Sequence, residues 1–433
     1  MICENTFIQG LITFLNNSPT PFHAVQSMKA ILALHGFTEL KEDQTWAIKK
    51  GEGYYVSRND SALIAFIAGF NDLNATGFRI IGAHTDSPCL KIKPEGMSQY
   101  KSYSQLNVEV YGGVLLNTWF DRDLSLAGRL SFVSQDQKIY SSLIDFKRPV
   151  AVIPSLAIHL DKEANKNRTI NAQNDLPPIL GQLTQQEELS FITVLKNECQ
   201  NNMPMIDDIL SFEIELYDTQ PAAITGLTKS FLTGHRLDNL ISCYAGIQSL
   251  IQGNRQYSSM VVCNDHEEVG STSSSGAYGN FLESVFKRVC IHSESFFRTI
   301  ARSFLISSDN AHGVHPNYIK RFDTAHGPIL NQGPVIKVNT NQRYASNSQT
   351  IAMFKYLCQK SGITAQPFVM RSDMACGSTI GPITASRMGI KTIDIGVPTF
   401  AMHSIRETAG VKDCYALYLV LRTFVTTGDL HLI

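Results

Sequence analysis

The chain has 433 residues, a length that predicts two domains and not one simple core. Its 37 Lys and Arg residues nearly balance its 38 Asp and Glu residues, which argues against nucleic acid or an anionic membrane surface as a partner. No stretch reaches the roughly 20 apolar residues that a membrane-spanning helix needs. The first residues also lack the basic region of an export signal. Small molecules or peptides are therefore the expected partners.

Cysteine usage points to a reducing compartment. Nine cysteines are scattered from Cys3 to Cys414, and none forms a Cys-x-x-Cys pair. An odd number at irregular spacing argues against both a disulfide framework and a thiolate zinc site. The cytoplasm is the expected location.

The first elements of the chain are predicted to be helices. Apolar residues recur at helical spacing between Phe7 and about Gly36, and the polar, proline-containing segment Asn17–Pro21 interrupts them. Two amphipathic helices are therefore expected before residue 37.

The middle of the chain has a different pattern. From about residue 93, apolar residues alternate with polar ones, as in the run that contains Phe212, Ile214 and Leu216, and this is typical of half-buried strands. From residue 236 onward, apolar strands again alternate with helical patterns. We therefore expect an α/β domain built from residues 1–92 and 236–433, interrupted by a β-rich insert over residues 93–235.

Two adjacent glutamates follow an apolar run in the second α/β block. Met260–Cys263 predicts a buried strand, and Glu267 and Glu268 come four and five residues after its end. A hydrolytic metal site needs one carboxylate to hold an ion and another to move protons. The alternative is a solvated acidic turn, which would be the better interpretation of this segment alone.

Three other apolar runs lead to residues of metal-ligand type. Residues 78–81 lead to His84, residues 303–306 to Asp309, and residues 392–395 toward His403. Ligands in open α/β sheets bind beyond the carboxyl ends of the strands, so we expect these side chains and the glutamates to converge.

Asp238 is a fifth candidate ligand. It opens a segment whose apolar residues repeat at helical spacing, so it is alternatively a helix N-cap. No Glu or Gln follows three residues later to complete a capping box, which leaves a second role open.

Nine segments together resemble the signature blocks of the aspartyl aminopeptidase family of dinuclear zinc metallopeptidases, of the bacterial type. They occur in family order over nearly the whole chain, which makes the resemblance specific although each block alone is weak. The segments are GAHTDSPCLKIKP from Gly82, NTWFDRDLSLAGR from Asn117, IPSLAIHL from Ile153, GHRLDNL from Gly234, DHEEVGS from Asp265, SSDNAHGVHPNY from Ser307, IKVNTNQRYASN from Ile336, CGSTIGP from Cys376 and AMHSIRE from Ala401.

The resemblance implies a mixed-sheet α/β zinc-peptidase catalytic domain interrupted by a β-rich dimerisation domain. It also implies two Zn²⁺ ions per chain and a homo-oligomer, a tetrahedral dodecamer built from dimers. Co²⁺ or Mn²⁺ could substitute, because both accept nitrogen and oxygen ligands. The metal-centre roles implied by the resemblance are Asp238 bridging the two ions, His84 and Asp309 at one ion, Glu268 and His403 at the other, and Glu267 as proton-shuttling base.

Asp86, two residues beyond His84, is a candidate to accept the second imidazole proton and fix the tautomer of His84. Its alternative is a turn-forming residue before Ser87 and Pro88. The resemblance implies a further role for His159, in the insert, which would reach the active site of a neighbouring subunit and stabilise the reacting carbonyl. From its apolar run alone it would instead be a core histidine.

The resemblance also implies that Lys337 and Tyr344 contact the substrate. A lysine facing the first side chain of a peptide would favour an acidic residue, and the alternatives are a solvated lysine and a packed tyrosine.

Asp121 and Asp123 flank Arg122 and are expected in ion pairs, not in the metal site. The roles of three nearby histidines stay open: His266, His312 and His315.

The sequence therefore predicts a zinc aminopeptidase that removes a first residue, preferably Asp or Glu, from short peptides. Three alternatives remain: a broad or neutral-residue aminopeptidase of the same family, a hydrolase of N-acyl amino acids, and a non-catalytic assembly protein. Retention of all five ligand types and Glu267 argues against the last.

Overall fold

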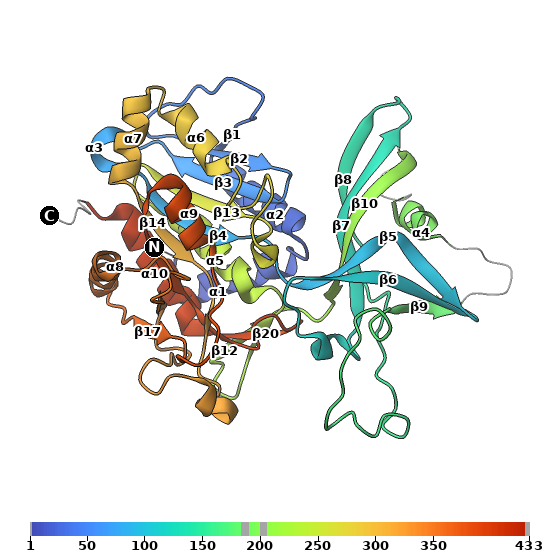
Figure 1. Cartoon of the computed structure of the whole chain (residues 1–433). Helices are drawn as coiled ribbons and strands as arrows, with labels where there is room; N and C mark the ends of the chain where they lie inside the picture. The colour runs from blue at the N-terminus through green and yellow to red at the C-terminus, as the bar shows by residue number, and fades with distance from the viewer. Residues whose placement is uncertain (1, 183–189, 200–205, 429–433) are drawn as a thin grey trace. The chain divides into compact units, whose positions relative to one another are not determined.

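The computed structural model describes residues 2–182, 190–199 and 206–428, which form helices and several mixed sheets (Figure 1). The chain divides into two units, each with a hydrophobic core of its own. The first comprises Met1–Ser87, Ala222–Met402 and Glu407–Ile433, and the second comprises Pro88–Pro221 and His403–Arg406. The α/β class expected from the sequence is confirmed.

The ends of the second unit differ from the boundaries predicted after residues 92 and 235. Residues 89–92 already belong to strand β5 (Cys89–Tyr100), which pairs with β6 (Tyr103–Tyr111). At the other end, β12 (Phe231–Gly234) pairs with β20 (Glu407–Gly410) of the first unit. Apolar alternation identifies a strand, but only its pairing decides which sheet it joins.

The first unit is built on a nine-stranded mixed sheet. Its central strands β13, β4, β14 and β18 are neighbours and mutually parallel. The strands are, in spatial order, β1 (Thr38–Glu39), β2 (Gly53–Arg58), β3 (Ala62–Ile67), β13 (Ser259–Asn264), β4 (Arg79–His84), β14 (Phe304–Ser308), β18 (Lys391–Gly396), β16 (Val335–Val338) and β17 (Gln366–Val369).

Both faces of this sheet are covered, because its strands are apolar on both sides. Along β3, Leu63 and Ala65 pack into one core, whereas Ile64 and Phe66 pack into another on the opposite face. Successive side chains of a strand point to opposite faces, so a continuous apolar run demands helices on both.

The helices accordingly form two layers. The helices packed into the first core are α1 (Glu4–Asn16), α2 (Pro21–Leu34), α5 (Leu237–Ile251), α8 (Ser348–Lys360) and α10 (Val411–Thr426). Those on the opposite face include α6 (Phe281–Val289), α7 (Ser293–Arg302) and α9 (Ile380–Met388), with the short α3 (Leu73–Thr76) against α7.

The two helices predicted before residue 37 are α1 and α2. The chain breaks between them where the sequence indicated. Thr20 caps α2 by accepting a hydrogen bond from the backbone N–H of His23, and Pro21 occupies the first turn, where its missing N–H costs nothing.

A smaller five-stranded sheet completes the first unit and joins segments from both sides of the insert. Its order is β11 (Ala223–Thr225), β12, β20, β19 (Pro398–Phe400) and β15 (Ala311–His312).

A buried carboxylate holds the loop before β16. Asp413 on α10 accepts the backbone N–H groups of Asn331 and Gly333. Burial raises the pKa of Asp413 to about 7. This contact anchors the loop that leads into β16.

The second unit is a six-stranded antiparallel sheet, as its alternating sequence predicted. Ile214 and Leu216 are buried in its core. Its strands are, in spatial order, β8 (Ile139–Asp145), β7 (Leu124–Ser134), β10 (Ile206–Asp218), β5, β6 and β9 (Ile179–Gln182).

One helix of this unit was not expected. Helix α4 (Phe191–Cys199) packs Phe191, Leu195 and Cys199 into the sheet core. These residues recur every four positions, which is helical spacing, but the pattern is too short to distinguish from its strand-rich surroundings.

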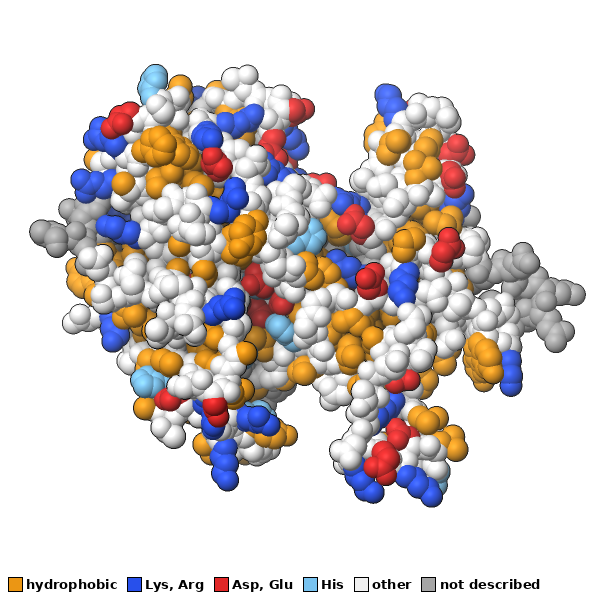
Figure 2. Space-filling view, in the orientation of Figure 1, with side chains coloured by type: hydrophobic (Ala, Val, Ile, Leu, Met, Phe, Trp, Pro, Cys, Tyr) orange, Lys and Arg blue, Asp and Glu red, His pale blue; other side chains and the backbone are white. Residues whose placement is uncertain are grey.

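The described surface carries mixed charge. On the face in Figure 2, basic and acidic side chains are interspersed, in keeping with a net charge of −1. Within the described residues, no helix combines the length and apolar character needed to cross a membrane.

Candidate metal centre

The predicted ligands of the first unit converge at one edge of the main sheet. Because β13, β4, β14 and β18 are parallel neighbours, their carboxyl ends share that edge. His84 is the last residue of β4, Asp309 directly follows β14, and Glu267 and Glu268 follow β13 within a short helical turn, Glu267–Val269. The topology places these four residues at the same edge of the sheet.

His84 lies at the centre of a group of carboxylates. Its Nε2 lies 3.4 Å from Asp238 Oδ1 and 3.5 Å from Asp309 Oδ1. Its Nδ1 donates to the backbone carbonyl of Asp86 at 3.0 Å. Burial would lower the pKa of His84, but the carboxylates of Asp238, Asp309 and Asp86 together raise that pKa well above its usual range. The surroundings thus attract positive charge to Nε2.

Asp86 connects the imidazole to the two glutamates. Its Oδ1 lies 3.4 Å from His84 Nδ1. Its two carboxylate oxygens also accept the backbone N–H groups of Glu267 and Glu268, each at 3.1 Å. One buried carboxylate therefore orients the ring and holds the adjoining turn. Asp86 therefore does more than form the turn before Ser87 and Pro88, which was its alternative role.

Asp238 is held from both sides by its backbone. Its N–H donates to Glu407 Oε2 at 2.9 Å, and its carbonyl accepts the hydroxyl of Ser87 at 2.6 Å. Its backbone angles are not helical, because the start of α5 is kinked at Asp238 and Asn239. Its side-chain Oδ1 lies 3.4 Å from His84 Nε2, a position compatible with the second role left open for it.

The setting of Glu267 is suited to a proton acceptor. Burial raises the pKa of Glu267 well above its usual range. A positively charged His84 acts to lower that pKa, whereas the carboxylates of Asp309 and Glu268 raise it further. A carboxylate with a raised pKa binds a proton more readily near neutral pH, which is what a general base at this position needs.

A divalent metal fits this donor set. His84, Asp238 and Glu268 each offer one ligand atom, and the three atoms lie within 4.8 Å of one another. Two ligands of a tetrahedral zinc, each bound at about 2.1 Å, lie roughly 3.4 Å apart. The distances from His84 Nε2 to Asp238 and Asp309, 3.4 and 3.5 Å, match that spacing. Imidazole nitrogen and carboxylate oxygen are ligands that zinc accepts.

Lys337 and Tyr344 border this centre. Lys337 is buried on β16, and its Nζ lies 3.3 Å from Asp309 Oδ2 and 5.5 Å from the ring centre of Tyr344. Burial and a hydrogen bond with Cys376 raise the pKa of Tyr344 above its usual range. Lys337 is therefore not the solvated lysine of the alternative interpretation.

Two predicted site residues belong to the second unit. His403 donates its Nδ1–H to the carbonyl of Gly113 at 3.0 Å, a contact within the second unit. His159 is exposed in a turn, so it is not the core histidine of the alternative interpretation. Their roles as ligand and as catalytic residue stay predictions.

The acidic pair of the insert, Asp121 and Asp123, lies in the second unit. Arg122 forms its ion pair with Asp218, not with its flanking neighbours. Asp121 accepts the backbone N–H of Ser155 at 2.8 Å and thereby fixes the segment before His159.

The three histidines of open role differ in their surroundings. His266 Nδ1 lies 2.9 Å from the hydroxyl of Ser273. His312 packs against Phe368, and His315 packs against Phe400. The last two line a cavity beside the centre.

Sequence reasoning missed several positioning residues. The clearest is Glu407, buried and bonded to the backbone of Asp238, and Cys243 similarly donates its thiol to the carbonyl of His84 at 3.0 Å. Glu407 is the last residue of the block AMHSIRE, and this position was the one feature of the sequence that could have identified it.

Comparisons with known proteins agree with this geometry. Residues 14–425 match the family described as aminopeptidase I zinc metalloprotease (M18). The chain is 54% identical to a probable M18 family aminopeptidase 2 of Ectopseudomonas mendocina (strain ymp) over 424 residues, which cover 98% of this chain and 99% of that one.

Solved structures give the same result. The fold matches a chain in a cryo-EM structure of the Ape4 and Nbr1 complex, with a TM-score of 0.94, 38% identity and coverage of 98% of this chain and 86% of that chain. It also matches the S. cerevisiae mApe1 dodecamer, with a TM-score of 0.83, 30% identity and coverage of 96% and 95%. Family model, relatives and fold agree over nearly the full length, so the chain belongs to the M18 family of zinc metalloproteases and is a zinc-dependent aminopeptidase.

Proposed function

We propose that the protein removes one N-terminal residue, preferably Asp or Glu, from short peptides with a dinuclear zinc centre. The observation that carries this proposal is the position of Asp238, whose carboxylate lies beside His84 and belongs to the same ligand group as Glu268. A carboxylate between two sets of ligands is suited to hold two ions about 3.5–4 Å apart. His84 and Asp309 would complete one site, and Glu268 and His403 the other.

Zinc in these sites would polarise the scissile carbonyl and make a bound water more acidic. Glu267 accepts the proton of the attacking water and returns it to the leaving amine. Asp86 keeps this base in place, because it holds the backbone of Glu267 and orients His84 at the same time.

Lys337 supports the acidic preference. Its ammonium group is buried beside Asp309 and Tyr344, where the side chain of a first residue next to the metals would lie. A buried ammonium pairs favourably with a carboxylate, so Asp and Glu should bind better than neutral residues.

Aminoacyl reporter substrates test this function. We expect the parent to hydrolyse Asp and Glu reporters faster than Leu and Ala reporters, and a chelator to abolish all four activities. Lys337→Met should lower kcat/KM for the acidic reporters by roughly 10-fold to 100-fold relative to the neutral ones. Lys337→Arg, which keeps the charge, is the matched control, and zinc content is measured in each variant.

The outcomes separate the alternatives. Equal rates on all four reporters would indicate a broad-specificity aminopeptidase. Cleavage of N-acyl amino acids that depends on a free α-carboxylate would indicate the other class of dinuclear hydrolase.

We further propose that the chain assembles with copies of itself, as a dodecamer built from dimers, and that His159 acts in the site of a neighbouring subunit. His159 lies between Leu156, Ile158 and Leu160, whose exposed fractions are 51%, 51% and 75%. Three exposed aliphatic side chains within five residues are unusual on a free surface and are suited to an interface. The solved mApe1 relative is itself a dodecamer.

We also propose that the protein acts in the cytoplasm, because its nine free cysteines support a reducing compartment.

Subunit exchange tests the shared site. His159→Ala and Glu267→Gln proteins should each be nearly inactive, but a mixture should recover activity, because an intact Glu267 can then meet an intact His159 from its neighbour. Random pairing predicts recovery of about a quarter of the parental activity. No recovery despite proven exchange, or a fully active monomer, would contradict the proposal.

A further inference from the structure

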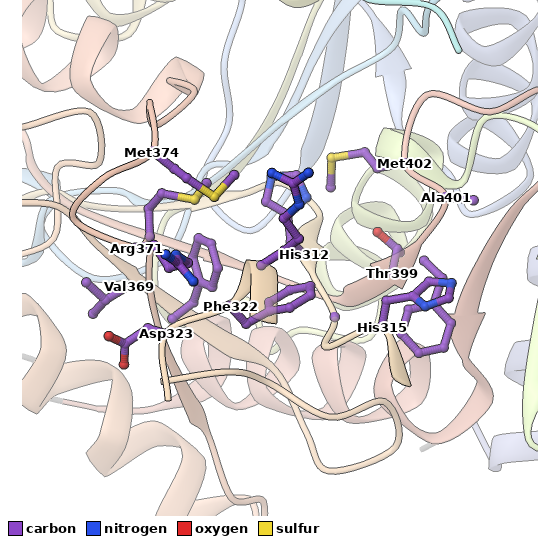
Figure 3. A pocket seen from close by; sticks show the side chains of 15 residues that line it. His312, His315, Phe322, Asp323, Val369, Arg371, Met374, Thr399, Ala401 and Met402 are labelled. Atoms are coloured by element: carbon purple, nitrogen blue, oxygen red, sulfur yellow. The ribbon is translucent and has the colours of Figure 1, made fainter. Parts of the chain in front are cut away.

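A cavity of about 270 Å³ lies in the first unit, separate from the residues proposed to bind the first side chain of a peptide (Figure 3). Of the described residues, neither Lys337 nor Tyr344 is among the fifteen that line it. Its apolar lining consists mainly of Phe322, Phe368, Met370, Met374, Phe400 and Met402. A dry apolar cavity of about 150 Å³ is enough for benzene, so this one has room for one large side chain.

The cavity shares a wall with the metal centre. His312, which lines it, is three residues beyond Asp309, and its ring packs on Phe368 with centroids 5.8 Å apart. Phe368 is the direct partner of Lys337 in the pairing of β16 with β17. Phe368 also packs in one small core with Tyr344. The cavity therefore adjoins the residues proposed to contact the first side chain of the peptide.

Three charged residues line the cavity, Arg321, Asp323 and Arg371, and the last two are engaged with neighbouring groups. The guanidinium of Arg371 binds both carboxylate oxygens of Asp373 and also donates to the carbonyl of Lys320. Asp323 is paired with the imidazole of His326 at 2.6 Å. Most of the cavity wall is aromatic and thioether surface, which is suited to an apolar occupant. Because Met side chains are flexible, the cavity wall can adapt to occupants of different shape.

We propose that this cavity binds the side chain of the second residue of the peptide, the one directly after the scissile bond, and selects large apolar residues. The inference rests on the proposed function, in which Lys337 and Tyr344 contact the first residue. Successive side chains of an extended peptide point in opposite directions, so the second side chain needs a separate pocket. A free amine at one end and an apolar second residue would together define the preferred peptides.

Tripeptides with Asp first, Ala third and Gly, Leu, Phe, Glu or Lys second test the proposal. The parent should show kcat/KM at least about tenfold higher for Leu or Phe than for Gly. Met374 is 38% exposed, so Met374→Lys can be made without disturbing a packed core. This variant should lose most of that preference and favour Glu over Lys at the second position. Met374→Glu should favour Lys over Glu.

Leu34→Lys is the matched control, because Leu34 is 84% exposed on α2 and does not line the cavity. It should keep the parental ranking. Indifference of the parent to the second residue, or an unchanged ranking in both Met374 variants, would overturn the proposal. So would a change confined to the ranking of first residues, since the cavity would then hold the first side chain. Absence of chelator-sensitive cleavage of every tripeptide by the parent would instead overturn the proposed function, and this inference with it.

Discussion

Glu267→Gln is expected to lower kcat by about 10²-fold to 10⁴-fold while the zinc content stays close to that of the parent. The amide keeps the size of the side chain but cannot accept the proton of the attacking water. The backbone N–H of residue 267 would still donate to Asp86, so the turn should keep its position. Stopped assays with an Asp reporter and elemental analysis of the same preparation measure the two quantities.

Glu268→Gln is the informative comparison, because it is the adjacent residue in the same turn. We expect it to loosen a zinc ion, so that activity falls together with metal content and is partly restored by added zinc. Glu283→Gln, in a partly exposed i,i+4 pair with Lys287 on α6, should change neither quantity. If the first two variants behaved in reverse, the base and the ligand would have to be exchanged.

Asp238→Asn is expected to remove zinc and activity together. Asn has nearly the same shape, but its neutral side chain cannot balance the charge of two ions. The backbone contacts of residue 238 with Glu407 and Ser87 do not use the carboxylate, so the start of α5 should remain folded. Elemental analysis and thermal unfolding, measured with and without added zinc, separate metal loss from unfolding.

Asp43→Asn, at an exposed position, serves as the control for the same chemical change. It should leave zinc content, activity and the unfolding midpoint unchanged. Two zinc ions per chain and full activity in Asp238→Asn would rule out the shared-ligand role. One ion retained with no activity would support that role, because only one of the two sites would have kept enough ligands.

Most of the candidate metal ligands could be identified in the sequence because they follow apolar runs. His84, Glu268 and Asp309 each come at or just after the carboxyl end of a strand, and parallel strands bring such ends together whatever their separation in sequence. The two N-terminal helices and the strands of the insert were likewise visible, since apolar residues repeat with the period of the element that buries them.

The tertiary structure alone decided how that centre is held. Asp86 bonds to backbone groups 181 and 182 residues away, and Glu407 to one 169 residues away. Such contacts leave no periodic trace, because a single polar side chain looks the same whether it meets water or a distant N–H group. The pairing of β12 with β20, the helix α4 and the apolar cavity beside His312 were decided in the same way. Local pattern determines which element forms, whereas its neighbours are determined by packing between segments that are remote in sequence.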